Sequence, residues 1–306
     1  EEGQQHQLWA WQWGRDEADQ WGILDANFAS DADLDACVAL ILAARAWNQP
    51  QYLDLARAKL ADLWALSTID IPNRQTSGGD RIFLPGPKEA FQPNLNQVHL
   101  NPSYLAPYAF RLFAQVDPDH DWGILVDSSY DILTQSAQIS TVGLPSDWVT
   151  LDLATGDYSP VNSSSGLVSQ YGFDAYRVWW RVALDAALTG EPQATAYLDQ
   201  HLSPLQEWWQ TTGSIPAEIN LQGDALVEYD SLAQYGMLYP AFSQTAAETA
   251  EQILNQALLP TYNRGIWASD TAYYTQNLIG LGLYPLSDLK RLDWQLEAAR
   301  QSPALP

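Results

Sequence analysis

The stretch WGILDANFASDADLDACVALILAARAW, from Trp21 to Trp47, decides the fold of this chain. Ser30 is a favoured helix N-cap residue, and Asp33 stands three residues later, where the acid of a capping box reaches back to the cap amide. Apolar residues then recur at helical spacing, at Leu34, Cys37, Val38, Ile41 and Leu42. The stretch therefore predicts a buried helix whose first turn carries Asp31, Asp33 and Asp35.

Acidic residues in a first helical turn usually have an ordinary explanation, because they complement the positive end of the helix dipole. Here the segment Leu24–Phe28 that precedes the helix is predicted to be extended and polar. Asp31 is therefore expected at the N-terminal end of a buried helix. This position makes it a candidate catalytic residue as well as a residue that stabilises the helix.

These residues resemble the signature of glycoside hydrolase family 8, A-[ST]-D-[AG]-D followed by an apolar helix that ends in A-x-x-x-W. Ala29 to Asp33 and the pair Ala43 and Trp47 match it, whereas Ala36 and Cys37 depart from it with other apolar residues. The stretch WGILDANFASDAD is most similar to the endoglucanases that accompany bacterial cellulose synthases. The resemblance implies an all-α (α/α)6 barrel and an endo-β-1,4-glucanase that hydrolyses cellulose-type glucans with inversion and without a cofactor.

The composition limits the other classes of function. The chain has 306 residues, of which 46% are hydrophobic, and 37 acids against 14 bases give a net charge of -23. This charge argues against nucleic acid and anionic membranes as partners. No run approaches the 18 apolar residues of a membrane span. The single cysteine, Cys37, is predicted to be a buried thiol, and the four scattered histidines have no metal-ligand spacing, so no metal site is expected.

Tryptophan and tyrosine dominate the aromatic residues, with 14 Trp and 15 Tyr against 7 Phe. Both side chains combine a flat apolar face with a polar edge, which suits stacking on a sugar ring as well as core packing. Trp9, Trp11 and Trp13 alternate and predict an extended segment. The family carries a similar segment in its substrate cleft, which makes Trp11 a candidate sugar platform; the alternative is that all three indoles anchor the start of the chain.

Between the two chemical stretches, the pattern predicts a helix from Pro50 to Leu66 and a long loop over 67–97 with one short strand at 82–84. Asn101 is predicted to cap a helix that begins at Pro102. The family has a similar N-P-S-Y, which implies that Tyr104 reaches the reaction centre and helps to hold the attacking water. Further elements are expected as a helix from Asp121 to Ala137 and a hairpin over 150–158 that turns at 155–156.

The second chemical stretch is YGFDAYRVWW, from Tyr171 to Trp180, in which Asp174 is predicted to lie in the first turn of a helix. The family has Y-[GD]-[YF]-D-A-x-R here, which implies that Asp174 is the general base. Arg177, three residues later, is placed to keep the carboxylate ionised or to bind a sugar hydroxyl. The alternative is a purely structural Asp–Arg helix pair.

The resemblance implies three more substrate-binding residues. Trp148 lies in a GLPSDWV segment that matches the family, and Tyr273 and Tyr274 resemble a tyrosine pair on the floor of the cleft. The remaining helices are expected as pairs, about 192–210 with 228–240 and 245–259 with 270–283, and a last helix near 287–299.

The whole chain, 1–306, is expected to form one barrel domain with a small β-hairpin excursion. About ten barrel-length helices can be predicted against the family's twelve, so we expect the first N-terminal helices to be lacking. In the family the general acid is the Glu of an S-E-G-Q-x-Y motif. Glu2, Gly3 and Gln4 match three residues of this motif. We therefore expect the acid to be either Glu2 or a glutamate upstream of this sequence.

The alternatives to a glucanase are a non-catalytic or inactivated β-glucan-binding protein that lacks the acid, or the same hydrolase acting on chitosan, xylan or mixed-linkage glucan. The expected partners are a β-1,4-glucan and a cellulose synthase complex. The opening residues EEGQQH show no basic or apolar segment of a signal peptide. The expectation of a secreted or periplasmic protein therefore comes from the resemblance alone.

Overall fold

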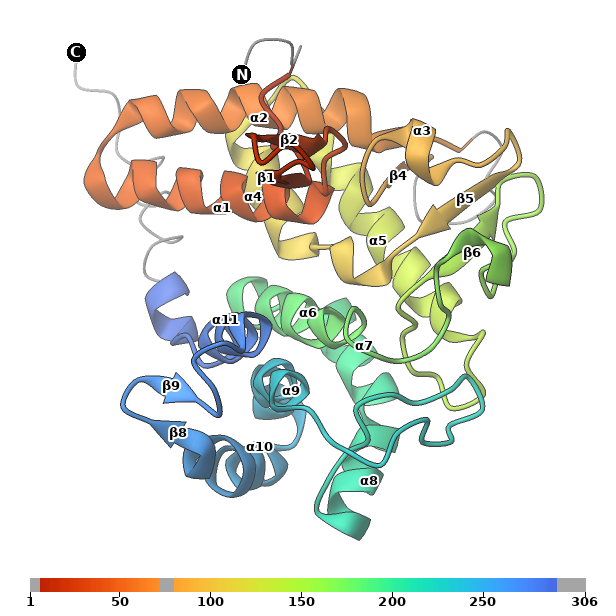
Figure 1. Cartoon of the computed structure of the whole chain (residues 1–306), viewed down its shortest axis with the longest axis vertical. Coiled ribbons are helices and arrows are strands. Elements are labelled where there is room, and N and C mark those ends of the chain that lie inside the picture. Colours follow the sequence, from red (N-terminus) through yellow and green to blue (C-terminus); the bar gives the residue numbers. More distant parts are fainter. Residues whose placement is uncertain (1–5, 72–79, 291–306) are drawn as a thin grey trace.

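A computed structural model describes residues 6–71 and 80–290, and in this part of the chain helices predominate (Figure 1). The α-helices are α1 (Ser30–Trp47), α2 (Pro50–Ser67), α3 (Lys88–Phe91), α4 (Pro107–Val116), α5 (Trp122–Ala137), α6 (Tyr176–Thr189), α7 (Pro192–His201), α8 (Ser203–Thr212), α9 (Leu232–Thr245), α10 (Ala247–Ile253) and α11 (Tyr273–Gly282). The all-α prediction is therefore confirmed.

The strands are short and pair locally. Antiparallel pairs are formed by β1 (Gln12–Arg15) with β2 (Trp21–Asp25), β3 (Thr68–Asp70) with β4 (Arg81–Phe83), and β8 (Tyr262–Asn263) with β9 (Ile266–Trp267). A three-stranded sheet has the order β5 (Gln97–Leu100), β6 (Val149–Asp152) and β7 (Tyr158–Ser159). The predicted hairpin over 150–158 is confirmed by β6 and β7, and β4 confirms the predicted strand. The region 67–97, predicted as a loop otherwise, also forms β3 and the short helix α3.

The first helix forms where the sequence predicts it, but its first turn is held differently. Ala29, not Ser30, is the N-cap residue, and Ser30 donates its hydroxyl to the Leu84 carbonyl at 2.5 Å. Asp33 accepts from the Trp9 amide and from Lys59 Nζ, at 3.1 and 2.7 Å, so the predicted capping box is wrong. The Ser30 and Asp33 side chains are both buried, and they bond to groups far away in the sequence instead of to the backbone of the first helical turn. Cys37 is buried as predicted, and burial raises the pKa of its thiol.

Helix α6 lies in the middle of the molecule, against α4, α7 and α9 (Figure 1). Most of its side chains are buried, including the charged Arg181 and Asp185, as expected for a helix that other helices surround. Helix α11 packs closely on α9. The backbones are so close that a Cβ atom added at Gly282 would lie 1.8 Å from the Gly236 carbonyl oxygen. Only glycine at position 282 allows this approach.

Other predicted boundaries move by a few residues. Asn101 does cap the turn that follows it, but this turn is a single 3-10 turn, η1 (Pro102–Tyr104), and the helix itself begins at Pro107. The helix predicted over 192–210 divides at Leu202 into α7 and α8. Residues 286–290 begin the predicted last helix, and its remainder lies outside the described residues.

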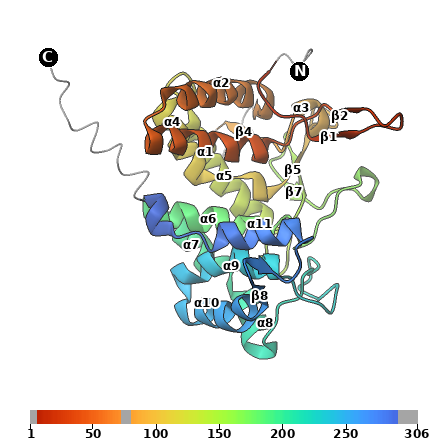
Figure 2. The ribbon, with the colours of Figure 1, turned by 60° about the vertical axis from the view of Figure 1, so that its left-hand side comes forward.

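Segments far apart in the sequence meet at one end of the molecule. The β1–β2 hairpin and the loops that surround β7 and precede α9 project on the same side (Figure 2). Helices α1 and α6 both begin near this end. None of the helices within 6–71 and 80–290 has the length and apolar character to span a membrane.

A buried ion pair fastens the N-terminal segment to the first helix pair. Lys59 on α2 pairs with Asp33 on α1 at 2.7 Å, and it also donates to the Gln7 carbonyl at 2.5 Å. The same ammonium lies 4.3 Å from the centre of the Trp9 ring. This one lysine therefore joins α1, α2 and the segment that leads to β1.

We predict that Lys59→Met lowers the free energy of unfolding by about 3–5 kcal/mol, because Asp33 is left as a buried carboxylate without its cation. Urea unfolding followed by circular dichroism measures the loss. The control is Lys88→Met, since Lys88 is exposed and lies 3.9 Å from an exposed acid, and it should change stability by less than about 1 kcal/mol. A double substitution, Asp33→Leu with Lys59→Met, should be less harmful than Lys59→Met alone. An equal loss in both would contradict the uncompensated-charge explanation.

Candidate active site

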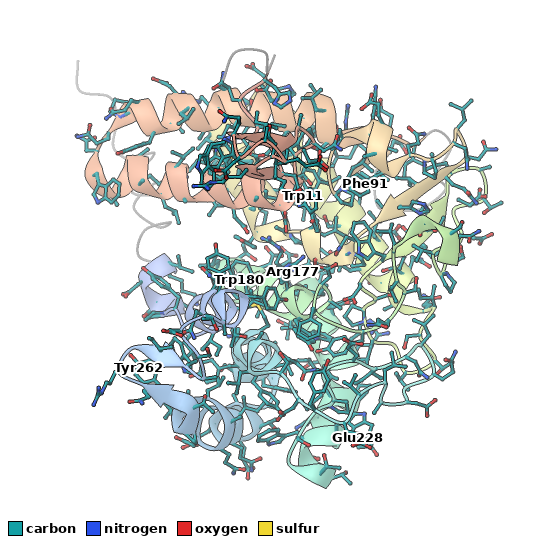
Figure 3. All side chains as sticks on the ribbon, viewed as in Figure 1. Trp11, Phe91, Arg177, Trp180, Glu228 and Tyr262 are labelled. Atoms are coloured by element: carbon teal, nitrogen blue, oxygen red, sulfur yellow. The ribbon has the colours of Figure 1, made fainter. Side chains whose placement is uncertain are left out.

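Two carboxylates from distant segments meet at one guanidinium group. Arg177, in the first turn of α6, places its Nη2 atom 2.9 Å from Asp174 Oδ1 and 3.8 Å from Asp31 Oδ2. Figure 3 shows Arg177 near the centre of the molecule, below the N-terminal hairpin. The two acids predicted from separate motifs are therefore neighbours, and a single cation lies between them.

Three donors hold the Asp174 carboxylate. Arg177 binds Oδ1, while Asn101 Nδ2 and the Trp148 indole N–H each donate to Oδ2 at 3.1 Å. An ionised carboxylate only accepts hydrogen bonds, so this arrangement suits the charged form and fixes its orientation. The prediction that Asp174 lies inside the helix is wrong by two residues, because α6 begins at Tyr176 and Asp174 lies in the preceding turn.

A closed ring of hydrogen bonds supports this geometry. Arg177 also donates to Ser103 Oγ at 2.9 Å, Ser103 Oγ donates to Asn101 Oδ1 at 2.7 Å, and Asn101 returns to Asp174. The N-P-S-Y motif predicts a role at the site for Tyr104 alone, and it predicts a helix cap at Asn101. Asn101 does both, since its oxygen caps η1 and its amide nitrogen binds Asp174.

Asp31 is more deeply enclosed than Asp174. Burial raises the pKa of its carboxyl group, and the charges of Arg177 and Arg181 act in the opposite direction. Arg181 lies one turn beyond Arg177 and forms a bidentate pair with Asp35, at 2.8 and 2.9 Å, one turn beyond Asp31. The two arginines of α6 thus face the two acids of α1 in register.

Two of the predicted aromatic residues surround this cluster. The Tyr104 ring centre lies 5.8 Å from the Arg177 guanidinium carbon and 6.4 Å from the Trp148 ring, and burial raises the pKa of its hydroxyl. Trp148 stacks on Phe91 with ring centres 5.7 Å apart and planes within 7°. One face of Trp148 is therefore covered, and its indole N–H is committed to Asp174.

The other predicted residues are placed less uniformly. Tyr274, at the start of α11, donates its hydroxyl to the Phe173 carbonyl beside Asp174, and burial raises its pKa to about 12. Tyr273 is 80% exposed, and its ring has no recorded contact with the cluster. Trp11 is 65% exposed at the base of the β1–β2 hairpin, above Arg177 in Figure 3. Glu2 lies outside the described residues.

The sequence profile of glycosyl hydrolases family 8 matches residues 2–276. The chain belongs to this family. The match includes both segments that carry Asp31 and Asp174, and it confirms the resemblance stated from the two motifs. Within 6–71 and 80–290, this family 8 chain has no cluster of His, Cys, Asp and Glu side chains that could hold a metal ion.

Family 8 relatives share both sequence and fold with the chain. It is 34% identical over 196 residues to an endoglucanase of Xanthomonas axonopodis, covering 64% of this chain and 46% of the relative. It is 28% identical over 212 residues to an endoglucanase of Escherichia coli, covering 69% of this chain and 52% of the relative. The chain thus spans about half the length of these relatives.

Solved structures extend the likeness to most of the described fold. An endo-1,4-D-glucanase of Vibrio fischeri superimposes with a TM-score of 0.73 at 25% identity, covering 90% of this chain and 74% of the other. The endo-β-1,4-glucanase CMCax of Acetobacter xylinum superimposes with a TM-score of 0.66 at 18% identity, covering 88% and 74%. The expected family 8 barrel fold is therefore confirmed.

Asp147 is a buried acid next to the Asp174 turn, and no sequence motif predicts a role for it. It accepts the Ala175 amide at 2.7 Å, at the N-terminus of α6. A Cβ atom at residue 172 would lie 2.6 Å from Asp147 Oδ2, so Gly172 is required for this approach. Burial, aided by the nearby charge of Asp174, raises the pKa of Asp147 to about 7. The clue in the sequence is its place beside Trp148 in the GLPSDWV segment.

We predict that Asp147→Asn reduces the pH dependence of stability. The folded state keeps the Asp147 proton up to about pH 7, whereas the unfolded chain releases it near pH 3.8. As the pH rises between these two values, Asp147 alone should therefore lower the wild-type free energy of unfolding by up to about 1.4 kcal/mol per pH unit. Urea unfolding at pH 5, 6 and 7 measures both slopes. Asp119→Asn, at an exposed acid, is the control and should keep the wild-type slope. Parallel slopes for Asp147→Asn and the wild type would contradict the assignment.

Proposed function

We propose that this family 8 chain is an endo-β-1,4-glucanase that hydrolyses cellulose-type glucans with inversion of the anomeric carbon. The observation that carries the proposal is the meeting of Asp31 and Asp174 at Arg177, at the helix ends that share one side of the fold. The relatives from Xanthomonas and Escherichia, both named endoglucanases, support the reaction class.

Asp174 is the general base in this proposal. Its carboxylate removes a proton from a water molecule that attacks the anomeric carbon on the face opposite the leaving oxygen. The three donors on Asp174 hold the carboxylate in one orientation, so that little rearrangement precedes proton transfer. Tyr104, next to the Arg177 guanidinium, completes the position of the water in the mechanism that the family motif implies.

Asp31 takes a different role because its surroundings differ. It lies beneath the sugar ring at the bond to be cleaved, where it binds hydroxyl groups and favours the distorted ring of the transition state. Arg177 interacts with both acids, so substrate contact at Asp31 and water activation at Asp174 are held in fixed relation. Trp11, Trp148, Tyr273 and Tyr274 are proposed to bind neighbouring sugar units.

Inversion requires a second carboxyl group that protonates the leaving oxygen, about 6.5–9.5 Å from the base. The candidates are Glu2, which matches part of the family motif, and a glutamate upstream of this sequence; Glu1 beside Glu2 offers a matched control. Glu2→Gln should lower kcat at least 100-fold if Glu2 is the acid, while Glu1→Gln should not. Full activity in Glu2→Gln would assign the acid elsewhere, and a wild-type chain that binds glucan without hydrolysis would favour the binding-protein alternative.

We further propose that the protein acts outside the cytoplasm, secreted or periplasmic, beside a cellulose synthase complex. The support is the likeness of the WGILDANFASDAD stretch to the endoglucanases that accompany such synthases. Fractionation of the native host with an antibody to this chain tests the location, and co-purification with the synthase tests the partner.

We predict that Asp174→Asn lowers the hydrolysis of soluble carboxymethyl cellulose by about 100- to 10,000-fold, because the amide cannot accept the proton of the water. Reducing-end assays give the rate, and calorimetry with cellohexaose should show affinity within about 3-fold of wild type. Asp157→Asn, at an exposed acid in the turn between β6 and β7, is the control and should keep wild-type activity.

The stereochemistry and the substrate preference give independent tests. The first product observed by proton NMR should be the α-anomer, and a β-anomer would contradict the proposed mechanism. Chitosan, xylan and mixed-linkage glucan should be cleaved more slowly than carboxymethyl cellulose. Faster cleavage of any of them would keep the Asp174 mechanism and replace the proposed substrate.

A further inference from the structure

The β1–β2 hairpin exposes large aromatic side chains. Trp13 is 62% exposed and Trp21 is 59% exposed, and Ile23 lies opposite Trp13 in the strand register. A hairpin that stands alone is marginally stable in water, and exposed apolar groups of this size commonly mark a binding surface. The hairpin projects on the same side as the loops around β7 and before α9 (Figure 2), and β2 leads to the start of α1, which carries Asp31.

These side chains form an ordered stack. The Trp13 and Trp21 rings are 4.7 Å apart with planes at 20°, and the Arg15 guanidinium carbon lies 5.0 Å from the centre of the Trp21 ring. Arg15 in turn pairs with Asp19 at 2.6 Å across the hairpin turn. Trp21 is therefore covered on both faces. Trp13 remains 62% exposed, and among the described residues Trp21 is the one aromatic ring that contacts it.

The exposed Trp13 side chain has the chemistry of a sugar platform. A flat indole face with a polar N–H at its edge can cover the C–H face of a pyranose ring and bind one of its hydroxyls. The stack behind the ring reduces its freedom before any ligand arrives, so less entropy is lost on binding. The net charge of -23 makes a neutral ligand more suitable than an anionic one.

The position of Trp13 indicates which sugar it would bind. Trp13 follows Trp11 by two residues, roughly 7 Å along an extended chain, and β2 leads directly into the helix that carries Asp31. A glucan chain that occupies the site and continues past Trp11 would run toward this hairpin. The occupant is therefore a distal glucose unit of the same chain.

We propose that Trp13, backed by Trp21, is an additional binding platform for long β-1,4-glucan chains, outside the Arg177 site. This inference rests on the proposed function, because it extends the set of side chains proposed to bind that substrate. It predicts that the platform contributes to binding of the polymer and contributes nothing to short oligosaccharides that fill only the site around Arg177.

The test compares Trp13→Ala and Trp21→Ala with Trp47→Ala. Trp47 is 64% exposed and packs edge-on against Tyr52, but it lies at the far end of α1, about 24 Å along the helix from Asp31. Kinetics on carboxymethyl cellulose and on cellotetraose give kcat and KM for each variant. We expect Trp13→Ala to raise KM for the polymer by about 3- to 10-fold and to leave both constants for cellotetraose within 2-fold. Trp21→Ala should raise the same KM by a smaller factor, and Trp47→Ala should match the wild type.

Two further measurements separate a binding role from loss of the hairpin. Trp13→Tyr keeps a ring and should restore most of the polymer affinity. Circular dichroism should show the exciton contribution of the Trp13–Trp21 stack as the difference between the wild type and Trp13→Ala, and Trp47→Ala should keep it. The contribution of the Trp64–Trp122 pair, with ring centres 5.2 Å apart, should be the same in all variants if the fold is kept. A polymer KM that is unchanged in Trp13→Ala, or raised equally for cellotetraose, would overturn the platform.

The proposed function and this inference fail in different ways. A wild-type chain that neither binds nor cleaves any glucan contradicts the proposed function. A wild-type chain that cleaves glucan normally while Trp13→Ala and Trp47→Ala behave alike contradicts only the platform.

Discussion

The structure depends on a cross-link between two helices that are far apart in sequence. Arg177 and Arg181, one turn apart on α6, face Asp31 and Asp35, one turn apart on α1. Arg181 is fully buried, so its charge must be compensated, and the bidentate pair with Asp35 supplies this together with donation to the Ser103 carbonyl at 2.8 Å. The Arg181–Asp35 pair therefore sets how closely α6 approaches α1, and so it sets the distance between Arg177 and Asp31 one turn away.

The same polar stripe continues along α6. Asp185, one turn beyond Arg181, accepts from Arg111 at 3.1 Å and from the Tyr130 hydroxyl at 2.6 Å. Residues 177, 181 and 185 thus bind α1, η1, α4 and α5 in turn, while most of the other side chains of α6 are apolar and buried. A central helix with one polar stripe can be surrounded by other helices and still orient the site acids, because each charged group of the stripe has an oppositely charged partner.

The proposed division of roles between Asp31 and Asp174 follows from the different surroundings of the two carboxyl groups. Asp174 lies in a turn, and three hydrogen-bond donors contact its carboxylate oxygens. Asp31 lies at the N-terminal end of α1, where burial raises the pKa of its carboxyl group more than Arg177 and Arg181 lower it. The hydrogen-bond ring through Asn101 and Ser103 joins the N-P-S-Y turn to the Asp174 turn. Two short motifs from different parts of the chain therefore act as one unit, and neither motif alone shows it.

The sequence by itself determined the helical fold, the family, and the two segments that carry the acids, because helical periodicity and short motifs are local properties of the chain. The tertiary structure alone decided which partners those residues take. Ser30 and Asp33 bind Leu84, Trp9 and Lys59 instead of the helix end, since buried polar groups accept the nearest long-range partner once the backbone is packed. The roles of Asn101 and Asp147, and the stack of Trp13 on Trp21, likewise arise from contacts between segments, and no spacing in the sequence encodes such contacts.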